Sequence, residues 1–97
     1  MVRVDPDIQA LIPGFLENKR RDVTKILGAL EQGDFPAIRI IGHSLKGDGG
    51  GYGFDAISEL GSAIEEAAIA KNGDHIRRRA AEMSSYLDRV EVVFEEE

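Results

Sequence analysis

The sequence contains no cysteine, which removes most of the usual ways in which a very small domain acquires chemistry. Without cysteine there is no disulfide framework, no thiolate zinc site and no thiol nucleophile. Basic residues are also a minority, with 12 lysines and arginines against 18 acidic residues and a formal net charge of −6. Because a nucleic-acid binder needs a basic face to neutralise phosphates, we expect no nucleic-acid partner.

Long apolar stretches are missing as well. The chain has no run of about 18 apolar residues, and its first six residues lack the apolar stretch of a signal peptide. We therefore expect neither a membrane span nor secretion, and a cytoplasmic location. The 97 residues have enough apolar side chains for one core and too few for two, so residues 1–97 are expected to form a single domain.

Three segments rich in glycine, proline and aspartate divide the chain into stretches with helical periodicity. These breaks are 33–36, 49–51 and 72–74, and nothing between them alternates with period two over a convincing length. We predict an all-α fold, an antiparallel four-helix bundle with a short N-terminal helix over about residues 6–12. The main helices are expected at about 13–32, 35–49 and 56–71 and after residue 74.

Local signals indicate how these helices begin and which faces they bury. Asp34, Asp55 and Asp74 are expected as N-terminal caps, and Gly33 as a left-handed stop. The charged run 19–22 is interpreted as a solvated turn of the first main helix. The last helix carries an apolar seam with spacings of four and three, which consists of Ile76, Ala80, Met83, Leu87, Val90 and Phe94.

The second main helix carries the residues suited to chemistry. Its buried stripe consists of Ile38, Ile41, Leu45 and Tyr52. On a wheel of about 100° per residue, His43 points away from this stripe and into solvent. If the helix continues through the glycines, the residues within about 60° of His43 are Pro36, Arg39, Lys46, Gly47, Gly50 and Phe54. His43 is therefore expected on a face that is cationic at Lys46 and bare at the glycines.

The glycines at 47, 49, 50 and 51 need an explanation, because glycine in a helix costs about 0.5 to 1 kcal/mol relative to alanine. One interpretation is that 49–51 form a turn between two helices. The other is that a bare backbone lets a partner approach the imidazole closely. An exposed neutral imidazole is a good nucleophile toward phosphorus, and Lys46 can offset part of the charge of a phosphoryl group.

Other kinds of site have weaker support. The segment 47–53 satisfies neither the GxGxxG nor the Walker spacing, and no strand precedes it. His43 and His75 are 32 residues apart, so a zinc site would need carboxylates such as Glu65 or Glu66 brought in by folding. We expect no metal and no nucleotide bound by this chain, and the metal-binding bundle remains an alternative.

Residues 43–47, His-Ser-Leu-Lys-Gly, together with Gly53, Leu60 and Glu65-Glu66, resemble the motif of histidine phosphotransfer (HPt) domains. The family pattern is H-x-L-K-G, then a stretch of small residues, a glycine at +10 and a glutamate near +22. The motif covers residues 34–68, and the helix count and length extend the resemblance to the whole chain. The chain departs from the pattern at Asp48, where a small uncharged residue is usual, and in its three consecutive glycines.

The resemblance implies a four-helix bundle in which His43 accepts a phosphoryl group and Lys46 helps to hold it. The residues expected to contact the partner are Arg39, Gly47, Gly50 and Phe54. The implied partners are response-regulator receiver domains, with a hybrid sensor kinase as a further candidate, and Mg²⁺ is expected in the receiver. Nothing resembles the ATP-binding domain of a sensor kinase, so we expect a monomeric carrier without kinase activity. A helical adaptor that binds a receiver without carrying phosphate remains the rival hypothesis.

Overall fold

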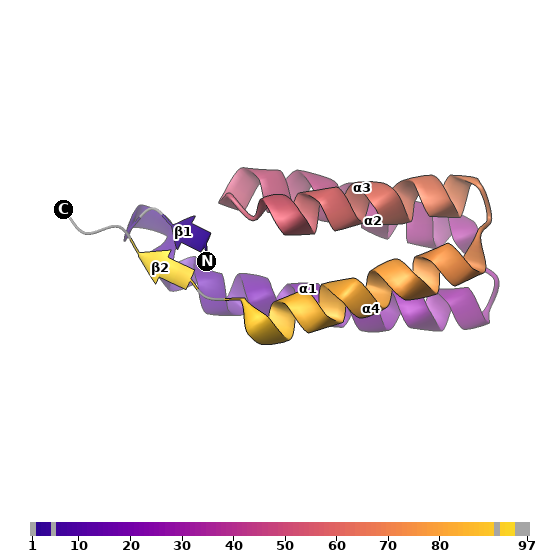
Figure 1. Cartoon of the computed structure of the whole chain (residues 1–97), viewed down its shortest axis with the longest axis horizontal. Coiled ribbons are helices and arrows are strands. Elements are labelled where there is room, and N and C mark those ends of the chain that lie inside the picture. Colours follow the sequence, from indigo (N-terminus) through magenta and orange to yellow (C-terminus); the bar gives the residue numbers. More distant parts are fainter. Residues whose placement is uncertain (1, 5, 91, 95–97) are drawn as a thin grey trace.

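A computed structural model describes residues 2–4, 6–90 and 92–94, and its main feature is a bundle of helices. A short 3-10 helix, η1 (Pro6–Leu11), leads into α1 (Ile12–Glu31), α2 (Phe35–Tyr52), α3 (Asp55–Ile69) and α4 (Gly73–Arg89). Figure 1 shows the helices lying alongside one another, with α2 and α3 on one side and α1 and α4 on the other. The predicted all-α four-helix bundle with a short N-terminal helix is confirmed. No helix in the described part of the chain is long and apolar enough to cross a bilayer.

Two short strands, which the sequence analysis did not predict, lie at the ends of the described chain. β1 (Val2–Val4) and β2 (Val92–Phe94) pair in parallel, with Val2 opposite Val92 (Figure 1). The apolar seam of the last helix is therefore shorter than predicted. α4 ends at Arg89, and Val90 already has extended backbone angles (φ −62°, ψ 129°), so the extension of the seam to Phe94 is wrong.

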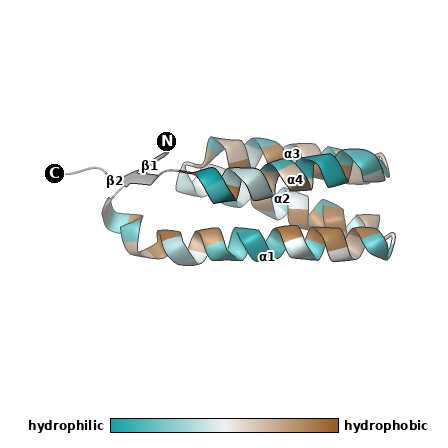
Figure 2. Cartoon of the chain, turned by 60° about the horizontal axis from the view of Figure 1, so that its bottom comes forward, coloured by the Kyte–Doolittle hydropathy of each residue, from teal (hydrophilic) through white to brown (hydrophobic). Residues whose placement is uncertain are grey.

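The bundle is held together by apolar side chains at helical spacing. Figure 2 shows hydrophobic and hydrophilic residues alternating along the ribbon of α1, as expected for a helix with one apolar face. The largest fully buried side chains of the described residues are Phe54, Ile26, Ile38, Leu45, Ile57, Ile64, Ile76 and Met83. Because the complete burial of one such side chain contributes about 1.5–3 kcal/mol, this core supplies most of the driving force for the bundle.

Of the three predicted N-terminal caps, one is confirmed and two are wrong. The side chain of Asp34 accepts a hydrogen bond from the backbone N–H of Ala37, as expected. Phe54, not Asp55, precedes α3, and Asn72, not Asp74, caps α4 by accepting from the N–H of His75. Both aspartates lie instead in the first turn of their helices, where a negative charge interacts favourably with the helix dipole. The preference of acids for helix starts thus locates the end of a helix only to within a residue or two.

The glycines 49–51 are helical, so their interpretation as a turn is wrong. α2 runs without interruption to Tyr52 and ends at Gly53, whose φ of +80° is the left-handed conformation that glycine adopts without strain. Gly33 has the same role after α1, with a φ of +68°, as predicted.

Candidate functional site

His43 lies on the outer face of α2, and 72% of its side chain is exposed. Ile38 and Leu45, on the opposite face of the same helix, are completely buried. The predicted orientation of His43, away from the core, is confirmed. The periodicity of one amphipathic helix is sufficient to produce it.

Glu65 of α3 holds the imidazole of His43. Its Oε2 atom lies 2.8 Å from Nδ1 of the ring, and its own side chain is only 16% exposed. A carboxylate can only accept, so in the neutral ring Nδ1 carries the proton and Nε2 keeps its free electron pair. Nε2 has no hydrogen-bond partner among the described residues. The arrangement therefore presents one nitrogen of known orientation to an incoming reactant.

Glycines at the α2–α3 contact make the short His43–Glu65 distance possible. A Cβ atom at Gly42 would lie 2.7 Å from the backbone nitrogen of Glu65, and one at Gly61 would lie 2.6 Å from that of Lys46. Real side chains essentially never make such contacts, so the two helices touch through their backbones. The wheel of α2 alone could not show that Glu65 reaches His43. The signal in the sequence was the glutamate 22 positions after the histidine.

Two cations lie on the same face of α2 as His43. Lys46 follows His43 by three residues and Arg39 precedes it by four, and both are exposed. Neither makes an ion pair with another described residue. Because i, i+3 and i, i+4 neighbours lie next to each other on a helix, both positive charges are close to the imidazole. This part of the predicted site is brought together by α2 itself.

Gly47 and Gly50 leave the helix surface beside His43 bare. Both are exposed, a Cβ at Gly47 would meet nothing within 4 Å, and one at Gly50 would approach only the Ser58 hydroxyl, at 3.9 Å. Packing within the bundle therefore does not require glycine at these two positions. Gly49 is different, since a Cβ there would lie 2.5 Å from the backbone nitrogen of Ser58.

The prediction that Phe54 lies on the exposed His43 face is wrong. Phe54 is completely buried, and its ring stacks on Phe15 with the centroids 5.2 Å apart. The reason is that the left-handed Gly53 ends α2, so the wheel that places Phe54 near His43 does not extend to residue 54. Phe54 is a core residue that fixes the start of α3 against α1.

Asp48, the departure from the HPt pattern, forms an ion pair with α1. Its carboxylate lies 2.6 Å from the ammonium group of Lys19, which is also 3.1 Å from Asp22. Burial by itself lowers the pKa of Lys19, but the hydrogen bonds and charges of Asp48 and Asp22 outweigh it, so the pKa lies above its ordinary value. The interpretation of 19–22 as a solvated turn is wrong for Lys19, which is 5% exposed. The negative charge of Asp48 is thus balanced by a cation.

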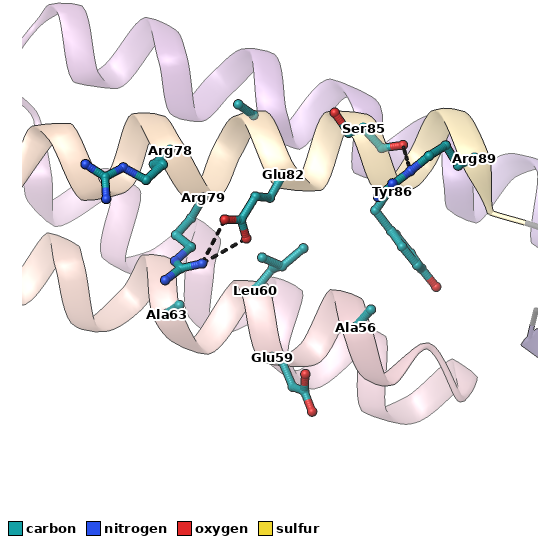
Figure 3. A pocket seen from close by; sticks show the side chains of 11 residues that line it. Ala56, Glu59, Leu60, Ala63, Arg78, Arg79, Glu82, Ser85, Tyr86 and Arg89 are labelled. Atoms are coloured by element: carbon teal, nitrogen blue, oxygen red, sulfur yellow. Dashed lines mark hydrogen bonds and ion pairs between the residues drawn. The ribbon is translucent and has the colours of Figure 1, made fainter.

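The other histidine and a groove between α3 and α4 are separate from this site. His75 belongs to α4, where its Nε2 accepts a hydrogen bond from Arg79. The groove, of about 800 Å³, lies between α3 and α4, and the Arg79–Glu82 ion pair spans part of it beside Leu60 (Figure 3). Within the described ranges no group of three or more histidine, aspartate or glutamate side chains is arranged to hold a metal ion.

Comparison with known proteins gave one match. A family model described as Hpt domain matches residues 10–92, which include all four helices. No curated protein and no solved structure matches the chain.

Proposed function

Because the chain belongs to the Hpt domain family, the histidine phosphotransfer domains of two-component systems, we propose that it carries a phosphoryl group on Nε2 of His43 between receiver aspartates. The observation that carries the proposal is the exposed imidazole whose Nδ1 lies 2.8 Å from Glu65. This contact leaves Nε2 as the free nucleophilic nitrogen.

The transfer step follows from that orientation. The electron pair of Nε2 forms a bond to the phosphorus of an aspartyl phosphate on the receiver. The bond between phosphorus and the carboxylate oxygen breaks, and its electrons stay on the receiver's aspartate. The ring keeps its Nδ1 proton, and the Glu65 carboxylate stabilises the positive charge that develops on the imidazole. The reverse step passes the group to a second receiver.

The neighbours of His43 support this step in two ways. The ammonium of Lys46 offsets part of the charge of about −2 on the phosphoryl group. Gly47 and Gly50 leave room for the receiver backbone to come close to the ring. Mg²⁺ would belong to the receiver, beside its aspartate, and we propose no metal in this chain. The chain would act as a monomeric carrier that takes phosphate from receivers, including that of a hybrid sensor kinase.

The test is incubation of the purified chain with a phosphorylated receiver domain that carries a radioactive phosphoryl group. We expect label to appear on the chain and to be lost in acid but not in base, as for a phosphohistidine. His43→Gln should abolish the labelling, whereas the control His75→Gln should be labelled like the wild type. Binding to the receiver without any labelling would support the adaptor, and labelling of His43→Gln would move the acceptor to another residue.

A further inference from the structure

Two exposed isoleucines each lie about one helical turn from the His43–Glu65 pair. Ile40 is 62% and Ile69 65% exposed, the highest values among the large apolar side chains of the described residues. Ile40 lies one turn before His43 on α2, and Ile69 lies one turn after Glu65 on α3. Because α2 and α3 are antiparallel neighbours, both isoleucines are displaced toward the same end of the bundle. Apolar side chains this exposed close to a reactive group are typical of an interaction surface.

A groove of about 480 Å³ adjoins Ile69 and lies between the start of α2 and the end of α3. It is lined by Phe35, Pro36, Arg39, Ala68, Ile69 and Lys71. Arg39 precedes His43 by one helical turn, so the groove adjoins the phosphotransfer site. The groove is therefore placed where a partner bound at His43 would also contact it.

The two basic side chains of this groove are free. Neither Arg39 nor Lys71 forms an ion pair with another described residue, although the chain has 18 acidic and only 12 basic residues. Five other basic side chains of the described residues, Lys19, Arg20, Arg21, Arg77 and Arg79, are paired with carboxylates, whereas Lys25, Lys46, Arg78 and Arg89 are not. Unpaired positive charge next to exposed apolar side chains fits a partner with an acidic rim, such as a receiver with its cluster of metal-binding carboxylates.

Lys71 occupies a backbone position at which glycine is the usual residue. Its φ of +55° is in the left-handed region, and it ends α3 with its N–H bonded to the carbonyl of Ala68. A side chain in this conformation costs stability that glycine would not cost. A lysine held there at such a cost is therefore a candidate for a role in binding.

We propose that the receiver docks on the α2–α3 end surface, defined as Arg39, Ile69 and Lys71 of this groove together with the exposed Ile40 of α2, which lies outside the groove, and that these side chains determine which receiver is accepted. The proposal rests on the proposed function, since the receiver must reach His43. It adds that the contact area extends from His43 toward the first turn of α2.

Ile69→Asp is the most direct test, because an exposed side chain is changed and the core is left intact. Two reactions are measured: transfer from the receiver domain that reacts fastest in a screen, and labelling by phosphoramidate, a small phosphoryl donor that needs no docking. We expect the KM for the receiver to rise about tenfold or more, because the replacement of a hot-spot residue typically weakens binding by at least that factor. The maximal rate and the phosphoramidate labelling should be unchanged. The matched control Leu27→Asp, at an exposed leucine of α1, should leave both reactions as in the wild type.

The outcomes separate the two proposals. A wild-type KM for Ile69→Asp would overturn the docking surface and leave phosphotransfer on His43 intact. An equal loss of phosphoramidate labelling would place the effect at the His43–Glu65 pair and would also overturn it. Failure of the wild-type chain to accept phosphate from any receiver would instead overturn the proposed function.

Lys71→Gly gives an independent test in which stability and binding move in opposite directions. The glycine relieves the left-handed strain, so the melting temperature should rise, while loss of the positive charge should raise the KM for the receiver. A higher melting temperature with an unchanged KM would remove Lys71 from the docking surface and overturn that part of the proposal.

Discussion

The ammonium group of Lys19 lies 2.6 Å from the carboxylate of Asp48 and joins α1 to α2, although the two residues are 29 positions apart. The lysine side chain is 6% exposed and the aspartate 45%. The ammonium nitrogen of Lys19 also lies 5.3 Å from the ring centroid of Phe15, within the range of a cation–π contact. The pair fixes the half of α2 that follows His43 against the bundle.

Lys19→Met should therefore destabilise the fold. Loss of the buried partner of Asp48 and Asp22 is expected to lower the free energy of unfolding by about 1 to 3 kcal/mol. Urea denaturation followed by circular dichroism measures the change. The control is Arg21→Met on the same helix, whose exposed ion pair with Glu17 is 3.8 Å long and whose loss should cost about 0.5 kcal/mol or less. Equal effects of the two changes would contradict the structural role of Lys19.

The stabilisation by Lys19 should disappear in alkali. The pKa of Lys19 in the folded chain is raised above its ordinary value of 10.5, so the charged form is favoured by folding. This contribution is complete below the ordinary pKa and is lost as the pH rises through the folded pKa. The difference in unfolding free energy between the wild type and Lys19→Met should thus be constant around neutrality and decrease at strongly alkaline pH. A difference that grows with alkaline pH would show that the sign is wrong.

Glu65→Ala should slow phosphotransfer with the fold retained, because the ring of His43 loses its hydrogen-bond partner on α3. We expect a loss of about tenfold or more, since a misplaced reacting group can cost up to about 100-fold. Glu65→Gln keeps an acceptor oxygen and should lose less. Nitrogen NMR of the ring checks the cause, because the Nε2-protonated tautomer should increase in the alanine variant. Glu66→Ala, at the exposed neighbour, is the control, and an equal loss there would contradict a specific role of Glu65.

Lys46→Ala should slow transfer and shorten the lifetime of the phosphohistidine. The exposed ammonium has no carboxylate partner among the described residues, so its removal should change stability by about 1 kcal/mol or less. Transfer rates and the decay of the labelled chain are the measurements. Lys25→Ala, at an exposed lysine of α1, should behave like the wild type. Unchanged kinetics for Lys46→Ala would make Lys46 an ordinary surface lysine.

Gly50→Gln should reduce transfer without loss of stability. Gly50 is helical and exposed with room for a side chain, so glutamine should be neutral or should stabilise by up to about 1 kcal/mol, while its volume obstructs the receiver. The adjacent Gly49→Ala is the contrasting control, since its Cβ would lie 2.5 Å from the Ser58 backbone and must lower the melting temperature. Unchanged transfer by Gly50→Gln would remove Gly50 from the contact area.

Much of the site could be predicted because it depends on one helix. The periodicity of α2 is a local property, and it places His43, Arg39, Lys46 and Gly50 on one exposed face whatever surrounds the helix. The same argument failed for Phe54, because it assumed a continuous helix and Gly53 ends it.

The sequence by itself determined the number of helices, their amphipathic faces and the exposure of His43, since these follow from spacings of three and four residues along each helix. Only the tertiary structure decided which side chains from different helices meet. The His43–Glu65 hydrogen bond exists because Gly42 and Gly61 let two backbones touch, and Lys19 is buried because Asp48 of another helix supplies its partner. Such contacts depend on the packing distance and rotation of whole helices, which no local pattern encodes.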